Sequence, residues 1–226
     1  MSSSAVKSDG MPLMTPEELA SSKPQPLKTL TMMGAATAIG TSIAFGLSFF
    51  TTSPATERAI SVAAEYNLAP LFLSGVVLAK AVAWVNFYPL AYKSGVMKRK
   101  SGNLRANMHV YKVLSSENED ESKAAKVVLC EDGNEGKYNR ANRSLTHMTE
   151  TIAGQIITTL LAGVVYPTAT LVCTIGWATG RIMHQCGYAE KGYGSHGTGF
   201  ALSTLASEVV SGLVLVAAAK TAMATE

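Results

Sequence analysis

Long apolar runs separate the polar stretches of this chain from one another. Uncharged or nearly uncharged segments cover residues 29–54, 68–92, 151–180 and 197–219. Several can form a helix of about 20 residues, the length that the roughly 30 Å hydrocarbon core of a bilayer requires. Hydrophobic residues make up 47% of the chain and charged residues only 15%. The pattern therefore predicts an all-α integral membrane protein in contact with the lipid bilayer.

We expect five membrane-spanning helices. They are predicted at residues 30–50, 68–92, 138–166, 167–188 and 198–219. Pro167 separates the third helix from the fourth, since proline cannot continue a helix but is tolerated in its first turn. Residues 1–28 are rich in Ser, Pro, Lys and Glu and are predicted to be a disordered tail. Residues 51–67 are expected to be a short link.

The long polar loop at residues 93–137 is predicted to be cytoplasmic. A basic cluster of Lys93, Lys98, Arg99 and Lys100 opens it, and short loops rich in Lys and Arg remain on the cytoplasmic side. Counting the spans places the N-terminal tail on the same side. Within the loop we expect residues 109–113 to be extended. The loop is expected to be too polar to pack as a core of its own. The net charge of +3 is small, so we expect no nucleic-acid partner.

Charged and polar side chains inside the predicted spans are the most informative feature. Two groups recur at spacings of three and four residues: Arg143, His147 and Glu150 before Pro167, and Arg181, His184 and Tyr188 after it. These spacings place each group on one helical face, and we expect the two faces to meet. Because ionised side chains are costly in lipid, Lys80 is expected to face the bundle interior or to extend its amine to the membrane interface. Glu208 is predicted to be buried in the middle of its span.

Two explanations of these charges remain open. They can form buried ion pairs that fix the helix register, for example Glu150 with Arg181. Alternatively, they can line a polar pocket between helices for an anionic ligand, since arginine binds carboxylates through two hydrogen bonds.

Two further motifs favour structural interpretations. Gly192, Gly194 and Gly197 match a nucleotide-binding glycine pattern, but a membrane helix and not a strand precedes them, so a turn between helices is expected. His147 and Glu150 resemble half of a di-iron motif, yet no matching pair occurs in another helix and no metal site is predicted.

The segments RSLTHMTETI, which starts at Arg143, and GRIMHQCGY, which ends at Tyr188, resemble the second-helix and third-helix signatures of the membrane-associated proteins in eicosanoid and glutathione metabolism. The resemblance implies a four-helix membrane bundle over residues 68–220, with residues 29–54 as an additional N-terminal transmembrane helix. It also implies a homotrimer with glutathione bound between subunits, and the endoplasmic reticulum as location, with mitochondrial or plastid membranes as alternatives.

The activity implied is that of a glutathione transferase or peroxidase acting on lipophilic electrophiles or lipid hydroperoxides. By motif position, the residues expected to bind glutathione are Arg143, His147, Glu150, Arg181, Tyr188 and Lys80. Tyr188 or His184 is expected to donate a hydrogen bond to the thiolate.

Two departures from the family pattern bear directly on function. Active members carry an arginine near the start of the last helix, whereas Lys191 and His196 are the only candidate cations between Ala189 and Phe200. The additional helix at residues 29–54 offers a surface for another membrane protein. An alternative prediction is therefore a non-catalytic subunit or scaffold of a larger membrane complex.

Overall fold

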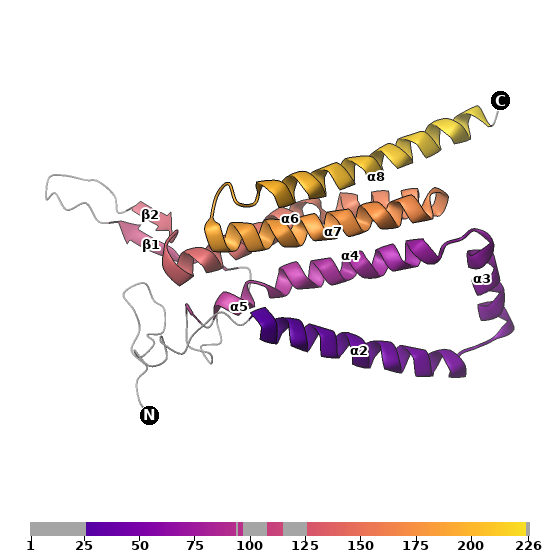
Figure 1. The fold of residues 1–226 in the computed structure, drawn as a ribbon, viewed down its shortest axis with the longest axis horizontal. Coiled ribbons are helices and arrows are strands. Elements are labelled where there is room, and N and C mark those ends of the chain that lie inside the picture. The colour runs from indigo at the N-terminus through magenta and orange to yellow at the C-terminus, as the bar shows by residue number, and fades with distance from the viewer. Residues whose placement is uncertain (1–25, 94, 97–107, 115–125, 225–226) are drawn as a thin grey trace, which may run out of the picture.

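The computed structural model describes residues 26–93, 95–96, 108–114 and 126–224, and helices dominate it (Figure 1). The long helices are α2 (Pro26–Phe50), α4 (Ala69–Phe87), α6 (Gly133–Val165), α7 (Pro167–Lys191) and α8 (Gly197–Met223). Helices α4, α6, α7 and α8 lie together as an elongated bundle, which confirms the predicted all-α membrane fold. The predicted tail at residues 1–28 lies outside the described residues except for Pro26–Lys28, which begin α2.

Among the described residues, the helices at Leu30–Phe50, Ala69–Lys93, Gly133–Val165 and Gly197–Met223 are long and apolar enough to cross a membrane. Helix α7 has 25 residues but does not qualify by composition. Its polar residues Thr170, Thr174, Arg181, His184 and Gln185 are buried against the neighbouring helices. A helix in the middle of a bundle can carry them because it does not expose them to lipid.

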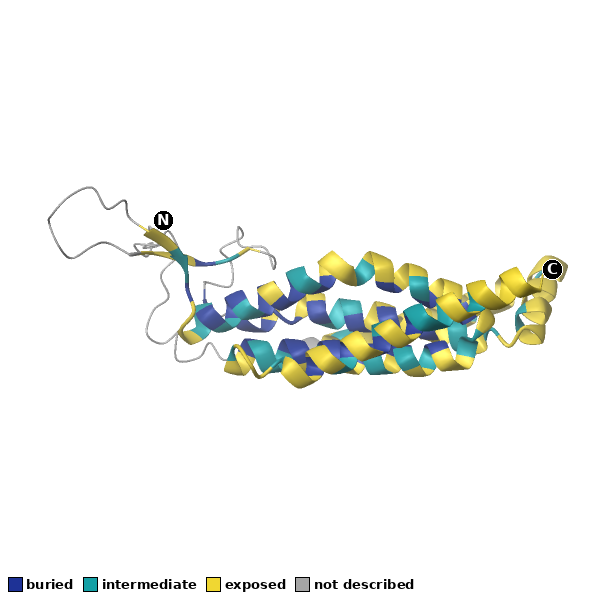
Figure 2. Ribbon diagram, turned by 90° about the horizontal axis from the view of Figure 1, so that it is seen from above, coloured by how far each residue is buried: buried dark blue, intermediate teal, exposed yellow. Residues whose placement is uncertain are grey.

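The core of the bundle is apolar and draws on all four helices. It consists of Leu78, Ala81 and Val85 from α4, Leu145 and Met148 from α6, Trp177 and Ala178 from α7, and Ala206 from α8. Figure 2 shows buried residues along the inner helix faces and exposed residues along the outer faces. That distribution, with large exposed apolar side chains outside, is what a bundle in lipid requires.

Two glycines bring α7 and α8 into backbone contact. A Cβ on Gly180 would lie 2.5 Å from the backbone nitrogen of Ser203, and a Cβ on Gly199 would overlap the backbone nitrogen of His184. Small residues that allow such close approach are typical of helix pairs in membranes. The contact holds the first turn of α8 directly against the polar half of α7.

Helix α2 stands apart from the bundle and is joined to it through a helix that the sequence did not predict. Residues 51–67, expected to be a link, contain α3 (Pro54–Glu65), which lies across the far ends of α2 and α4 (Figure 1). The Ser53 side chain caps it by accepting a hydrogen bond from the Thr56 backbone N–H at 3.1 Å. None of the residues in the apolar part of α2 is buried.

The opposite end of the bundle, called the hairpin end below, carries a small antiparallel hairpin. Strand β1 (Tyr111–Leu114) pairs with β2 (Lys126–Leu129), which confirms the extended piece predicted near residues 109–113. The short helix α5 (Leu90–Lys93) lies at the same end, after a turn at residues 88–89, and it completes the candidate span Ala69–Lys93, predicted at residues 68–92.

The described part of the long loop packs on the helices, so its apolar residues join a helix core and do not form a core of their own. Val96, Val110 and Cys130 are buried with Tyr92 of α5 and Tyr138 of α6. These loop residues flank the polar stretches and are apolar enough to pack on the helices. The basic residues at 98–100 and the acidic run at 117–121 lie outside the described residues.

Candidate functional site

A cavity of about 220 Å³ opens at the hairpin end, between α6, α7 and the start of α8. Its lining consists of Arg143, Ser144, His147, His184, Tyr188, Tyr193, His196 and Phe200. The set combines one guanidinium, three imidazoles, two phenols and the hydroxyl of Ser144 with a single phenylalanine. It is a polar, aromatic pocket at the end of an otherwise apolar bundle.

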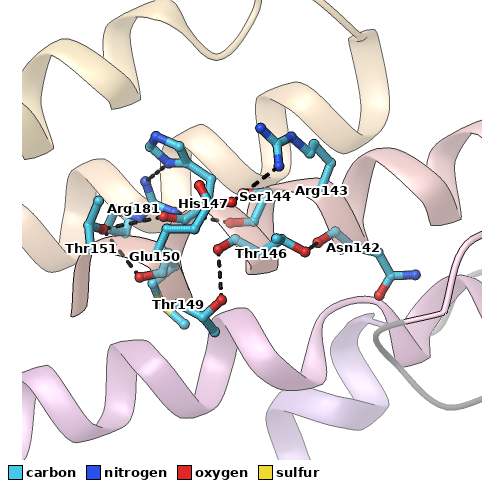
Figure 3. A network of polar contacts seen from close by, with 10 residues as sticks. Asn142, Arg143, Ser144, Thr146, His147, Thr149, Glu150, Thr151 and Arg181 are labelled. Atoms are coloured by element: carbon cyan, nitrogen blue, oxygen red, sulfur yellow. Dashed lines mark hydrogen bonds and ion pairs between the residues drawn. The ribbon is translucent and has the colours of Figure 1, made fainter. Parts of the chain in front are cut away.

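The two predicted polar faces meet through Arg181 (Figure 3). Its side chain is buried, and Nη1 lies 3.0 Å from Nδ1 of His147 while Nη2 donates to the backbone carbonyl of Ser144 at 3.1 Å. A guanidinium can only donate hydrogen bonds, so Nδ1 of His147 accepts. The neutral His147 ring therefore carries its proton on Nε2, and it offers that N–H as a donor.

Arg181 itself does not line the cavity. The buried ion pair between Glu150 and Arg181, offered as an alternative from the sequence, is not formed. Glu150 instead lies 3.5 Å from Arg143 on the same helix, and the two side chains are 52% and 55% exposed. Arg143 lines the cavity, whereas Glu150 does not.

The inner wall of the cavity consists of two stacked imidazoles. His147 and His184 have ring centroids 5.7 Å apart, and His184 Nδ1 is hydrogen bonded to Ser144 Oγ at 2.9 Å. Phe200 of α8 contacts both rings, with centroid distances of 6.0 and 6.4 Å. Tyr188 lies one turn beyond His184, at a ring distance of 6.1 Å.

The turn between α7 and α8 supplies the outer wall. Gly192 and Gly194 have φ values of 83° and 93°, which favour glycine. A Cβ on Gly187 of α7 would overlap the backbone carbonyl oxygen of Ser195, so the absence of a side chain at Gly187 lets the turn lie directly on α7. The glycine pattern predicted to be an interhelix turn is confirmed as one.

This turn places His196 in the cavity. The centroid of its ring lies 5.2 Å from those of His184, Tyr188 and Tyr193. Lys191, the other cation considered in this segment, is exposed and does not line the cavity. His196, Tyr193 and Phe200 were not among the predicted site residues. The close glycine contacts that bring them in cannot be read from spacing along one helix.

Two charged residues of the predicted spans, Lys80 and Glu208, lie away from the cavity in this chain. Lys80 is exposed on α4, where Nζ donates a hydrogen bond to Thr37 Oγ1 of α2 at 2.8 Å. Glu208, expected to be buried in the middle of its span, is exposed on α8, so that prediction is wrong. Its position faces outward because the core-facing positions of this part of α8 are Ala206 and Val210.

A second polar network fixes the end of α7. Glu190 accepts hydrogen bonds from the Tyr92 hydroxyl and from Lys137 Nζ, the latter at 2.7 Å. Arg140 Nε donates to the carbonyl oxygens of Tyr188 and Ala189 at 3.0 and 3.2 Å. These contacts tie α5, α6 and α7 together beside the cavity. Within the described ranges, no three His, Cys, Asp or Glu side chains are grouped so as to hold a metal ion.

Comparison with known proteins identifies the bundle. The model of the MAPEG family matches residues 67–216, from the residues just before α4 to well into α8. The matched range contains every residue of the cavity and leaves α2 and α3 outside it. No curated protein and no solved structure matches the chain.

Proposed function

Since this chain belongs to the MAPEG family of integral membrane proteins, we propose that it is a glutathione-dependent transferase or peroxidase acting on lipophilic electrophiles or lipid hydroperoxides. The observation that carries the proposal is the cavity at the hairpin end, where Arg143, His147 and Tyr188 converge between α6 and α7. It offers donors for an anionic, water-soluble ligand next to a lipid-facing surface from which an apolar second substrate can enter.

The groups in and around the cavity suit a tripeptide with two carboxylates, an amine and a thiol. Arg143 can bind a carboxylate through two hydrogen bonds, and Glu150 beside it can accept from the amine. The His147 Nε2–H and the Tyr188 hydroxyl are neutral donors deeper in the cavity. Arg181 donates a hydrogen bond to His147 Nδ1 and does not line the cavity, so in this proposal it acts on glutathione by orienting His147.

For the thiolate, Tyr188 and His184 remain the proposed donors. His184 Nδ1 is engaged by Ser144, which leaves Nε2 as the nitrogen available to a ligand. Tyr188 reaches the cavity from the next turn of the same helix. A thiolate needs such donors, because a free thiol ionises only near pH 8.5.

One protomer forms only part of the proposed glutathione site. Its cavity of about 220 Å³ is smaller than the roughly 300–1,000 Å³ of most small-molecule pockets. We propose that a neighbouring subunit of a homotrimer completes it and that Lys80, exposed on α4, is presented to the neighbour. The endoplasmic reticulum is the proposed location, with mitochondrial and plastid membranes as alternatives.

The test begins with glutathione binding to the purified protein in detergent, measured by calorimetry. Turnover is then assayed with a reactive aryl halide and with a lipid hydroperoxide. We expect Arg143→Gln to weaken glutathione binding by about tenfold, as loss of one charged hydrogen-bonding group does. The matched control is Arg58→Gln, which removes an exposed arginine from α3 at the other end of the bundle. Binding without any turnover would exclude the enzymatic function.

A specific observation supports the alternative, a non-catalytic subunit of a membrane complex. The apolar part of α2 buries no residue within the chain, so most of its surface is open to another membrane protein. The mass of the assembly extracted in mild detergent distinguishes the two functions. A homotrimer that binds glutathione supports the enzyme, whereas a single copy beside unrelated chains, without glutathione binding, supports the subunit.

A further inference from the structure

His196 differs from the other two imidazoles in the cavity because neither of its ring nitrogens is hydrogen bonded to another described residue. Its Nδ1 is buried and has no partner, so Nε2 is the nitrogen that a ligand can reach. In contrast, His147 Nδ1 accepts from Arg181, and His184 Nδ1 is paired with Ser144 Oγ. His196 is thus held in the cavity by packing alone.

The other two imidazoles are poorly suited to take up a proton. His147 already has its proton on Nε2, and its remaining lone pair faces the Arg181 guanidinium, so a second proton would place two cations in contact. His184 is buried one turn from the same guanidinium, where an added positive charge would be neither solvated nor paired. Among the described residues that line the cavity, His196 is the imidazole whose Nδ1 is engaged neither by a guanidinium nor by a hydroxyl group.

The surroundings of His196 hold the ring but do not neutralise it. The ring is edge-on to His184 and Tyr188 of α7 and to Tyr193 of the turn. From α6, Arg143 and His147 face the same cavity. A positive charge on His196 therefore has a cation and neutral groups around it. An anion bound in the cavity would provide the compensating charge.

We propose that His196 is the catalytic base that accepts the thiol proton of glutathione. The inference rests on the function proposed above. The S–H bond breaks and an N–H bond forms at Nε2, which leaves an imidazolium beside a thiolate. The sulfur then forms a bond to the electrophilic carbon of an aryl halide, and the halide leaves with its electron pair. The proton on His196 passes to water.

The experiment compares His196→Gln with Lys191→Gln, which removes the other cation of the same turn without touching the cavity. Wild-type and variant proteins are titrated with glutathione by calorimetry. The bound thiolate is followed by its ultraviolet absorbance, and turnover of an aryl halide is measured across pH. His196→Phe is a second variant, since it retains the edge-on ring packing but has no nitrogen.

We expect both His196 variants to bind glutathione within about threefold of wild type but to turn over about 100-fold more slowly at neutral pH, the effect expected for loss of a general base. Their thiolate absorbance is expected to be absent at neutral pH and to develop only as the pH approaches the value for a free thiol, about 8.5. Turnover then converges with wild type at high pH. Lys191→Gln is expected to behave as wild type throughout.

The outcomes separate this inference from the function on which it rests. If a folded His196 variant shows wild-type thiolate absorbance and turnover at neutral pH, His196 is not the base, although the protein is still a glutathione enzyme. An equal loss in Lys191→Gln would likewise exclude a specific role for His196. A wild-type protein that binds no glutathione overturns both proposals.

Discussion

Arg181 Nη1 lies 3.0 Å from His147 Nδ1, and this contact between α7 and α6 decides which nitrogen His147 presents to the cavity. Without the guanidinium, the imidazole is free to place its proton on either nitrogen and to rotate. We therefore expect Arg181→Met to lower the affinity for glutathione by about 10-fold or more, since hydrogen bonds to charged groups contribute roughly 1.5–3 kcal/mol.

Calorimetry with Arg181→Met and with the remote control Arg58→Met measures this effect. His147→Gln changes the other partner of the contact. The glutamine side chain has both an oxygen that can accept from Arg181 and an N–H that can donate toward the cavity, so we expect it to bind glutathione better than Arg181→Met does. An Arg181→Met protein that binds glutathione as well as wild type would show that His147 does not depend on Arg181.

The ion pair of Arg143 and Glu150 is expected to matter for the ligand and not for the fold. The two groups are 3.5 Å apart and more than half exposed, and exposed pairs contribute at most about 1 kcal/mol to stability. Glu150→Gln should leave the melting temperature in detergent unchanged while weakening glutathione binding about tenfold. A large loss of thermal stability with unchanged binding would assign the pair a structural role.

Gly199 is expected to tolerate no side chain. A Cβ there would overlap the backbone nitrogen of His184, and forcing extra atoms into a packed contact costs about 1–3 kcal/mol. Gly199→Ala should therefore lower the melting temperature and open the cavity between α7 and α8. Gly212→Ala in the same helix is the control, since nothing lies within 4 Å of its Cβ position; equal melting temperatures for the two variants would contradict the close contact.

Asn139 is expected to hold the described part of the loop onto α6. Its side chain accepts from the Val110 N–H and donates to the carbonyl oxygens of Val110 and Cys130, each at 2.8 Å. Asn139→Ala removes all three bonds, including the acceptor of the buried Val110 N–H, at a cost of about 1–3 kcal/mol, although the Val110 carbonyl still accepts from the Cys130 N–H. Hydrogen exchange of the Val110 and Cys130 amides should become faster in this variant. Asn134→Ala is the control: it loses one long hydrogen bond of 3.4 Å, and exchange at the same two amides should change much less.

His109 is expected to make stability depend on pH. Partial burial, and then the charge of Arg143, lower the pKa of its imidazole below the ordinary 6.5. The unfolded chain therefore binds a proton before the folded one as the pH falls. Stability is greatest above about pH 6.5 and decreases below it. His109→Gln should flatten this part of the curve of melting temperature against pH, and an unchanged slope would show that other groups cause it.

The sequence predicts the bundle well because lipid imposes a simple rule on composition and length. The apolar runs and Pro167 place the helices within a few residues of their ends, and the spacing of Arg143, His147, Arg181 and His184 brings the right faces together. Even α7, whose composition alone does not qualify it as a span, is predicted, because an apolar run continues to residue 180 and Pro167 marks where the helix begins.

The features that the sequence missed depend on contacts across the chain. Helix α3 is short and polar on one side, so it resembles a link. His196 enters the cavity only because Gly187 and Gly199 allow backbones to touch, and this cannot be inferred from helical spacing. Glu208 was expected to be buried because charge in lipid is costly, but that argument requires only that the carboxylate be shielded, not that its own chain shield it.

Helix α2 also decides at which end of the bundle the described chain begins. Helices α4, α6, α7 and α8 run alternately along the bundle, so α4 begins at the same end at which α8 finishes. With α2 added, residue 26 lies at the hairpin end and Met223 at the opposite end (Figure 1). If α2 spans the membrane as predicted, its first residue and the end of α8 face opposite compartments, and the start of α2 faces the same side as the cavity.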